Sequence, residues 1–592
     1  MSGEPDIGDY GLIGDCQSAA LVSRGGAIDW CCLPDFDSPA IFCRILDREK
    51  GGYWEIQPKA PFTTQRRYLH NSNVLETVFQ CETGEARLID LMPIREDGTG
   101  QSLRILRLIE GIDGHLRLRI RFRPTFDFAL HACQLSVNSQ TIIAVSGSES
   151  AALCSNLPFE IHGDLAESWC DISASQQIWL ALSYDHSNAR YDEATFAHEL
   201  NRTVEHWKNW SEKSLYAGPH SDLVRRSALV LKLLTYNRTG AIIAAPTTSL
   251  PERIGGDLNW DYRYTWLRDS GLILDVLQRL GFHDESMRFF DWVESICMCG
   301  DIQPVYTISG ERDLAEATLN HLAGYRDSKP VRIGNAAAQQ IQYDIYGHVL
   351  EAAWLCYSRM PRPMKPEFWE VLVRLANGAM ARWQRPSHGL WETRDEPRHY
   401  VYVKLFCWVA LDRAVRLAEF LRLDGALAEW RETRDQIRDY ILQQGFNPKR
   451  GVFTSVIGED TTDPSLLVLA LTGCVSFDDP RMKATVAAIR RSFEHRGLLY
   501  REIPQPGHPW EREGAFILCT CWLIDYLVLS GKRDEGSKLL DRLISYANDL
   551  GLFAEEVDPA SGNLLGNFPQ GFSHLGITRS ILNMGGSRNP TT

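Results

Sequence analysis

The chain lacks any segment that would place it in a membrane. None of its 592 residues starts a run of 18 or more apolar side chains, roughly the length that a membrane-spanning helix needs. The N-terminus, MSGEPDIGDYGLIG, also lacks the basic stretch and the following apolar stretch of a secretion signal. We therefore expect a cytoplasmic protein with no membrane partner.

Concentrated positive charge is missing too. The formal net charge is −14, and no Lys/Arg-rich run occurs anywhere in the chain. Binding the phosphate backbone of a nucleic acid needs a concentrated basic face, so we expect no nucleic-acid partner. An uncharged small molecule suits this charge better.

Sequence motifs for nucleotides and metals are absent as well. The chain has no GxxxxGK(S/T), no GxGxxG followed by a helix, no HExxH and no EF-hand loop, so we expect no cofactor and no metal. Isolated histidines such as His348 and His574 are more typical of core or capping positions than of ligands. The 15 cysteines are scattered without a repeated CxxC, and we predict buried, unpaired thiols in a reducing compartment.

What the chain does contain changes character near residue 191. Residues 8–192 are cut by Gly, Asn, Asp and Pro into short β-rich runs such as GAIDWCCL and QIWLALSY. In LRLRIRFR, apolar and arginine side chains alternate with the period of a strand in a sheet that has one solvent-exposed face. We predict an N-terminal antiparallel β-sandwich over residues 1–190. Its loop 33–39 is either a cover over a neighbouring pocket or a surface turn.

Beyond residue 191 the apolar period becomes 3.6, first in a predicted helical linker over residues 191–220. The remainder divides into twelve predicted helices. Six helical hairpins can close into a ring of inner and outer helices, and we predict such an all-α (α/α)6 barrel over residues 221–592, with its loops converging on a central cavity. The helices are expected at about 222–236, 269–279, 285–295, 338–357, 366–383, 400–421, 426–444, 463–471, 480–493, 513–530, 533–547 and 573–582.

Residues 253–271, RIGGDLNWDYRYTWLRDSG, combine aromatic and ionisable side chains in a way that suits a sugar ring. Such a ring has apolar C–H faces and a rim of hydroxyls, which aromatic and charged groups can grip. The opposing interpretation is that the aromatic residues are buried helix positions, and that Asp269 and Ser270 cap the helix that follows. Sequence alone leaves both interpretations of this segment open. Its aromatic and ionisable residues are Trp260, Tyr262, Tyr264, Trp266, Arg268 and Asp269.

Cleaving a glycosidic bond takes two carboxyl groups, one to protonate the departing oxygen and one to activate water. Glu392 is the first candidate, because it follows Trp391, whose ring can desolvate a carboxyl and favour its protonated form. Pro397 favours a loop over a helix here. The alternative is a surface loop in which Glu392 pairs with Arg394 and Arg398.

Glu555 is the second candidate, in GLFAEEVDPASGNLLGNFPQGFSH. If the backbone is extended, successive side chains alternate, so that Glu555 and its neighbour Glu556 point in different directions. At most one of the two would then be the base. The residues alone favour an acidic, solvated loop at this position.

Several segments resemble glycoside hydrolase family 15, the glucoamylase, glucodextranase and trehalase group, and the resemblance covers nearly the whole chain. GDYGLIGDCQSAALVSRGGAIDWCCLPDFDSPAIF is similar to the start of the family's N-terminal domain. AAPTTSLPE and NWDYRYTWLRDSG resemble the first substrate-binding segment. GLWETR resembles the general-acid loop, and LFAEEVDPASGNLLGNFPQGFSHL the general-base loop.

The resemblance implies a role for each matching residue. Glu392 would be the general acid and Glu555 the general base. The glucose ring at the cleaved end would be held by Arg268, Asp269, Arg501 and Trp391, with Trp266 and Tyr264 in the same substrate-binding segment. Glu513 stays open as an acidic alternative.

The family further implies an exo-acting hydrolase that releases β-glucose from the non-reducing end of α-glucosides, with inversion of configuration. Inversion requires the two carboxyl groups to stand roughly 6.5–9.5 Å apart, with a water between the base and the anomeric carbon. Without a secretion signal or a starch-binding module, we expect a small substrate such as trehalose or a short maltose- or isomaltose-type sugar. A trehalase and a glucoamylase both stay open.

Two other functions compete with hydrolysis. A sugar phosphorylase on the same barrel would need a basic phosphate pocket opposite the acid, whereas Glu555 and Glu556 would repel phosphate. A non-catalytic carbohydrate-binding protein would use the aromatic residues but would need neither Glu392 nor Glu555. The sequence carries no prediction of the oligomeric state.

Overall fold

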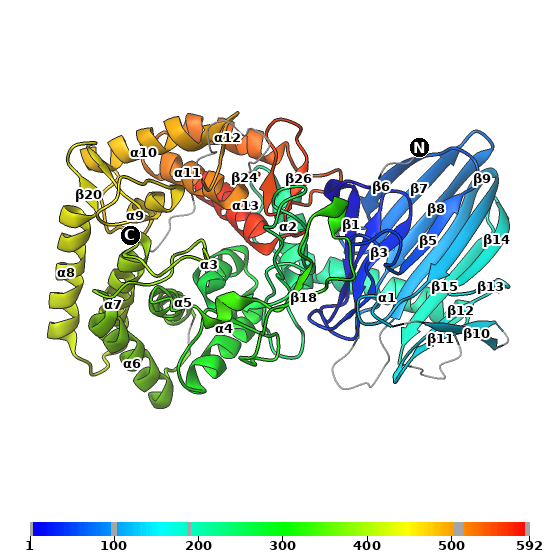
Figure 1. Cartoon of the computed structure of the whole chain (residues 1–592), viewed down its shortest axis with the longest axis horizontal. Coiled ribbons are helices and arrows are strands. Elements are labelled where there is room, and N and C mark those ends of the chain that lie inside the picture. The colour runs from blue at the N-terminus through cyan, green and yellow to red at the C-terminus, as the bar shows by residue number, and fades with distance from the viewer. Residues whose placement is uncertain are drawn as a thin grey trace.

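The computed structural model describes residues 4–95, 104–131, 133–138, 140–185, 191–360, 362–502 and 513–586. Figure 1 shows two parts side by side, a β-rich part built from the N-terminal residues and a helical part built from the rest. The predicted boundary at residue 190 falls on 186–190, which lie outside the described residues.

The β-rich part is an antiparallel sandwich whose two layers share one long strand, β9 (Arg104–Arg123). The first half of β9 pairs with β8 (Gly84–Leu91) and β15 (Gln177–Tyr184), and the second half with β5 (Tyr53–Pro58) and β14 (Leu165–Ser173). The other strands are β1 (Tyr10–Gly14), β2 (Ala19–Ser23), β3 (Ala27–Cys32), β4 (Ala40–Phe42), β6 (Thr63–Tyr68), β7 (Leu75–Cys81), β10 (Gln134–Asn138), β11 (Thr141–Ser146), β12 (Glu149–Ser155) and β13 (Glu160–His162).

The alternation predicted in the second half of β9 is confirmed. The apolar residues of LRLRIRFR are buried, and the four arginines between them are partly or fully exposed. Phe122 packs edge to face against Trp54 of β5, with 6.0 Å between ring centroids. The buried face of β9 therefore belongs to the sandwich core, as a period of two requires.

Helix α1 (Glu193–Ser211) follows the sandwich, and the twelve helices α2 to α13 of the described chain follow α1. Helices α3, α5, α7, α9, α11 and α13 contact one another in that order, and α13 contacts α3, so they form a closed inner ring. The helices of the barrel are α2 (Ser221–Leu233), α3 (Ser270–Leu280), α4 (His283–Met298), α5 (Ile345–Arg359), α6 (Pro366–Arg382), α7 (Val401–Leu421), α8 (Leu427–Gln444), α9 (Val468–Leu471), α10 (Pro480–Phe493), α11 (Ile517–Leu529), α12 (Arg533–Ile544) and α13 (Gly571–Met584).

Inner and outer helices differ in sequence because they differ in burial. The inner helix α11, ILCTCWLIDYLVL, is buried at every residue but its last. The outer helix α8, LAEWRETRDQIRDYILQQ, buries only Trp430, Ile437 and Ile441. A helix covered on all sides is apolar all round, and one at the surface has a single apolar stripe. This pattern, repeated round the ring, is the predicted (α/α)6 barrel.

Three inner helices begin later than predicted. Helix α5 begins at Ile345 rather than near 338, because Ala336–Gln339 form a 3-10 turn. Helix α9 begins at Val468 rather than near 463, because Pro464–Leu467 form a 3-10 turn. Helix α11 begins at Ile517 rather than at 513, because Ala515–Phe516 form strand β24. The residues ahead of α5 and α11 lie at the end of the barrel that carries the candidate site.

Loop 33–39 is neither a pocket cover nor a surface turn. Phe36 is 1% exposed and packs edge to face against Tyr236, which follows α2 in the helical part. The Tyr236 hydroxyl donates a hydrogen bond of 2.9 Å to Asp35. Both expectations for this loop are therefore wrong, because it packs between the sandwich and the barrel.

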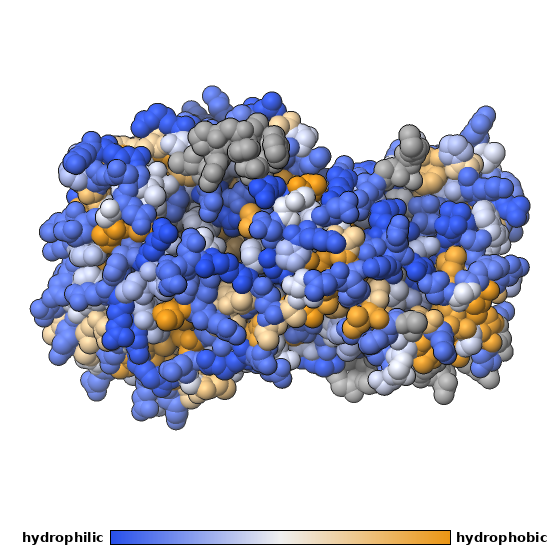
Figure 2. Space-filling model, in the orientation of Figure 1, coloured by the Kyte–Doolittle hydropathy of each residue, from blue (hydrophilic) through white to orange (hydrophobic). Residues whose placement is uncertain are grey.

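The surface and the cysteines agree with the composition. The face drawn in Figure 2 is mostly hydrophilic, with apolar residues in separate areas. All 15 cysteines are free thiols, and only Cys299 is exposed. In the described residues, no helix has both the length and the apolar character that a bilayer crossing requires.

Candidate active site

Glu392 and Glu555 line one cavity at an end of the barrel, although they are far apart in the sequence. Glu392 lies in the loop between α6 and α7, and Glu555 directly precedes strand β25 (Glu556–Val557), which pairs with β24 and β26 (Leu564–Leu565). The cavity has a volume of about 60 Å³. Its other lining residues are Ala244, Tyr262, Trp266, Arg268, Asp269, Leu390, Trp391, Arg501, Phe516, Leu518, Trp522, Gln570 and Phe572.

Three side chains donate hydrogen bonds to the Glu392 carboxylate. Its Oε1 accepts from Arg268 Nη1 at 2.7 Å, from Trp266 Nε1 at 3.1 Å and from Gln342 Nε2 at 3.2 Å. Among the residues that the structure describes, the only donor near Oε2 is Trp266, at 3.4 Å. Oε1 is therefore fixed, and Oε2 is the oxygen that remains available to a ligand.

The Glu392 backbone is strained, and its loop is held by further bonds. Its φ of 53° lies in the left-handed region, which is uncommon for a residue with a side chain. Gln340 Nε2 donates to the carbonyl oxygens of Glu392 at 3.2 Å and of Thr393 at 3.1 Å. Arg394 pairs with Glu316 and Arg398 with Glu459, so neither forms the ion pair with Glu392 that a surface loop would have.

Glu555 is buried, with 3% of its surface exposed. Its Oε1 accepts a hydrogen bond of 2.8 Å from the Tyr262 hydroxyl, and its Oε2 has no hydrogen-bond partner among the described residues. Burial, followed by the charge of Glu252, raises the pKa of Glu555 well above its ordinary value, against the lowering effect of Arg501. The solvated loop that the residues alone favoured is wrong.

Glu556 points away from this cavity, as alternation in an extended backbone predicts. Its Oε2 accepts a hydrogen bond of 2.7 Å from the backbone N–H of Gly514. Burial and the charge of Glu513 raise the pKa of Glu556 well above its ordinary value. Of the two adjacent acids, only Glu555 lines the cavity.

Arg501 lies between acidic side chains at the rim of the cavity. One guanidinium nitrogen, Nη2, is 2.7 Å from Glu252 and 2.6 Å from Glu513. Within the described parts of the chain, Glu252, Glu513 and Glu556 are also the one acidic group close enough together to hold a metal ion. Because the guanidinium already pairs with two of the three, we assign Arg501 as the cation of this cluster. Residues 503–512, between Arg501 and Glu513, lie outside the described residues.

The predicted ring-binding residues are brought together, with one exception. Trp391 packs against Phe516 and Trp522, with ring centroids 5.7 and 6.1 Å apart. Tyr264 instead packs in a buried apolar cluster with Val305 and Leu314 and lines none of the cavities described here. Its predicted contact with substrate is corrected to a packing role.

Asp269 does not cap the helix that follows it, because its side chain forms no capping hydrogen bond. It lines the cavity instead, 7% exposed, and its Oδ1 has no hydrogen-bond partner among the residues described. Burial raises the pKa of Asp269 to about 7, although Arg268 opposes this. A carboxyl with a pKa near 7 can donate a hydrogen bond to a sugar hydroxyl when protonated and accept one when ionised.

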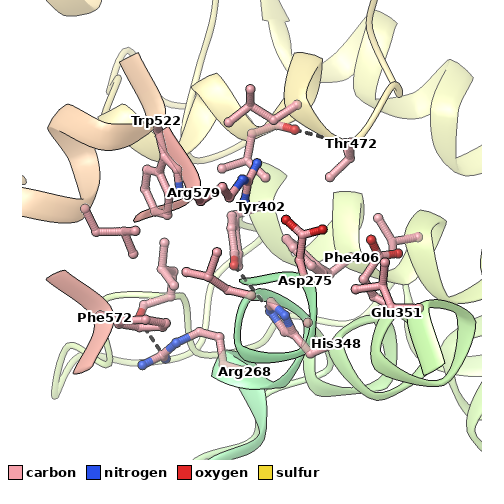
Figure 3. Close-up of a pocket in the computed structure, with 18 of the residues that line it drawn as sticks. Arg268, Asp275, His348, Glu351, Tyr402, Phe406, Thr472, Trp522, Phe572 and Arg579 are labelled. Carbon is pink, nitrogen blue, oxygen red and sulfur yellow. Dashed lines mark hydrogen bonds between the residues drawn. The ribbon is translucent and has the colours of Figure 1, made fainter. Parts of the chain in front are cut away.

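A second cavity of about 130 Å³ lies deeper, on the other side of Arg268. Figure 3 shows side chains of the inner helices pointing into it, among them Asp275, Glu351 and Tyr402. Its charged groups are paired, Glu351 with Arg413 and Asp275 with arginines on α3 and α5. Arg268, Leu390, Leu518, Trp522 and Phe572 line both this cavity and the first.

A third cavity, of about 410 Å³, adjoins the first on the outer side and shares Tyr262, Trp391, Glu392 and Arg501 with it. We call it the outer cavity. The Trp260 ring on its wall is approached by two guanidinium groups, with Arg332 at 4.3 Å and Arg394 at 4.7 Å from the ring centroid. Glu316 pairs with both arginines. The outer cavity therefore presents donors and acceptors around an aromatic ring.

Several contacting residues received no role from the sequence. Tyr262 was noted only as an aromatic residue, yet it donates the hydrogen bond to Glu555. Gln342, a donor to Glu392, was placed inside a helix. Glu252, which pairs with Arg501, is the last residue of the motif AAPTTSLPE. Its place in a motif that resembles a substrate-binding segment was the one sequence signal that could have indicated a role for it.

Comparisons with known proteins agree over both parts of the chain. The models described as glycosyl hydrolases family 15 and as trehalase-like, N-terminal, match residues 218–582 and 2–207. A trehalase of Mycolicibacterium smegmatis is 35% identical, over 98% of this chain and 91% of the relative. A trehalase of Thermoplasma volcanium is 33% identical, over 98% and 93%. A bacterial glucoamylase solved with acarbose has the same fold, with a TM-score of 0.75 at 16% identity over 98% of this chain and 94% of its own.

Proposed function

The chain belongs to glycosyl hydrolases family 15 and is a glycoside hydrolase, and we propose that it hydrolyses trehalose with inversion. Glu392 is the general acid and Glu555 the general base. The observation that carries this proposal is one cavity lined by two carboxylates, one fixed by three donors and one with a free oxygen. Inverting glycosidases work with such a pair on opposite faces of the sugar.

The proposed reaction is a single displacement at the anomeric carbon. Glu392 Oε2 gives its proton to the glycosidic oxygen as the bond from that oxygen to the anomeric carbon breaks. A water next to Glu555 Oε2 attacks the same carbon from the other face and gives its proton to Glu555. Arg268, Asp269 and Arg501 hold the hydroxyls of the ring. Glu392 ends ionised and Glu555 protonated, and exchange with solvent resets both.

Trehalose is favoured as the substrate by the relatives and by the outer cavity. Relatives named trehalase match both parts of the chain along nearly its full length. The outer cavity lies directly beyond Glu392 and Arg501, where the second sugar of a disaccharide would extend. Phosphorolysis is disfavoured because Glu252, Glu513 and Glu556 beside the base would repel phosphate.

The anomeric form of the products tests inversion directly. Trehalose has two α-linked anomeric carbons, and only one is attacked. We expect early time points in proton NMR to show equal amounts of α- and β-glucose, with oxygen from labelled water only in the β-glucose. Release of α-glucose alone would contradict the roles given to Glu392 and Glu555. Glucose 1-phosphate formed in phosphate buffer would favour the phosphorylase.

The outer cavity is expected to bind the leaving sugar, which gives a selective mutational effect. Trp260→Ala removes the ring that holds Arg332 and Arg394 in place. We expect kcat/KM for trehalose to fall about tenfold, equivalent to about 1.4 kcal/mol. Hydrolysis of α-glucosyl fluoride should be unchanged, because fluoride does not reach the outer cavity.

The matched control is Trp354→Ala, since Trp354 on α5 also stacks with an arginine, Arg416, but lines none of the cavities described here. Steady-state kinetics with both substrates should show no selective loss in this control. Equal losses on trehalose and on the fluoride in Trp260→Ala would show that Trp260 does not act through the leaving sugar.

A further inference from the structure

We propose that Arg263 is a positioning residue through which the N-terminal sandwich holds Tyr262, and with it Glu555, in place. The inference rests on the proposed role of Glu555 as the base. It gives the sandwich a part in the reaction, although loop 33–39 lines none of the cavities described here.

Arg263 lies next to Tyr262 and is 1% exposed. Its Nη1 donates a hydrogen bond of 2.7 Å to the carbonyl oxygen of Ser38, in loop 33–39. Its Nε and Nη2 donate to the two carboxylate oxygens of Asp261 at 2.8 and 2.6 Å. One planar group thus joins the sandwich to the residue on the other side of Tyr262, with the fixed geometry that a guanidinium allows.

Asp261 extends this connection into the barrel. Its Oδ2 accepts from the backbone N–H of Gly334 at 3.1 Å, and its carbonyl oxygen accepts from Asn335 Nδ2 at 3.2 Å. Asn335 lines the outer cavity. The residues that flank Tyr262 are therefore fixed on both sides, by the sandwich and by a loop of the barrel.

The sandwich also holds the backbone that pairs with Tyr262. Trp30 of β3 donates from Nε1 to the carbonyl oxygen of Pro246 at 2.7 Å. The preceding residue, Ala245, donates its backbone N–H to the carbonyl oxygen of Tyr262 at 2.9 Å. Two separate contacts from the sandwich thus converge on the backbone of one tyrosine.

The position of Tyr262 bears on chemistry because its hydroxyl is the one hydrogen-bond donor found for the Glu555 carboxylate in the described chain. A bond donated to a carboxylate favours the ionised form. If the tyrosine shifts, the pKa of Glu555 rises. Glu555 then becomes protonated, and stops acting as a base, at a higher pH than in the wild type. The charged and titratable neighbours of Glu555 are Tyr262, Glu252, Arg501, Glu513 and Glu556, and those of Arg263 are Asp261, Cys32, Asp37 and Tyr264.

The test compares two buried arginines of the same domain interface. Arg263→Lys keeps the positive charge but removes the planar guanidinium that donates to Ser38 and to both carboxylate oxygens of Asp261. Arg226→Lys is the matched control, because Arg226 on α2 donates to the carbonyl oxygen of Ser72 in the sandwich at 2.8 Å and lines none of the cavities described here. We expect both to lower Tm. Only Arg263→Lys should lower kcat, by about tenfold to a hundredfold, with KM nearly constant.

The pH profile separates positioning from stability. In Arg263→Lys, the acid limb of kcat/KM for α-glucosyl fluoride should move to higher pH, as it should in Tyr262→Phe. An unchanged kcat and acid limb, with only a lowered Tm, would overturn the inference. If Arg263→Lys does not fold, Asp261→Asn provides the same two readouts. A wild-type activity in Glu555→Gln would instead overturn the proposed function.

Discussion

Glu555→Gln is expected to lower kcat by about 10²–10⁴-fold, the range that positioned general bases supply. The amide has nearly the same shape and can still accept the hydrogen bond from Tyr262, but it cannot take a proton from water. Because nothing that holds the ring is removed, KM should change little. Trehalose and α-glucosyl fluoride should be affected alike, since both need the attacking water.

Glu556→Gln is the matched control for this variant. Glu556 is the next residue, is also buried and carries a pKa raised by the same environment. It accepts a hydrogen bond from the backbone N–H of Gly514 and lines none of the cavities described here. We expect it to affect stability more than turnover. If kcat falls as much in Glu556→Gln as in Glu555→Gln, lining the cavity does not distinguish the base, and the assignment of Glu555 as the general base fails.

The architecture was predictable because burial leaves a clear mark on helices. The inner helix α11 reads as one apolar run, whereas α8 shows only a stripe around Trp430 and Ile437. The alternation in β9 marked the sandwich in the same way. Helix starts were less predictable, since residues 336–339 and 464–467 form 3-10 turns and residues 515–516 form a strand.

The site was predictable only where the family resemblance supplied it. The residues around Glu555 predicted a solvated loop, because local sequence does not show which distant segments cover a loop. Its environment is set by Tyr262, Glu252 and Arg501, which come from two other regions of the chain. For the same reason Tyr264 was predicted to touch substrate, although it lies in a buried apolar cluster with Val305 and Leu314. Contacts between distant segments decide both cases.

Glu392→Gln is expected to give the second large loss, again about 10²–10⁴-fold in kcat, but on trehalose only. A sugar alkoxide is a poor leaving group and needs the proton of the acid. Fluoride leaves with little protonation, so α-glucosyl fluoride should still be hydrolysed at close to the wild-type rate. Arg268 and Trp266 can still donate to the amide oxygen at Oε1, so the loop should stay in place.

Glu396→Gln is the control, because Glu396 lies in the same loop but is exposed. It should leave both substrates unaffected. The two active-site variants then assign the roles by their difference: loss of the base stops both reactions, and loss of the acid stops one. If Glu392→Gln lost both activities equally, Glu392 would be a residue that holds the ring, and Glu513 would become the acid to test. If the variant kept trehalose hydrolysis, protonation would have to come from another group of the cavity, and Asp269, with a pKa of about 7, is the carboxyl placed to supply it.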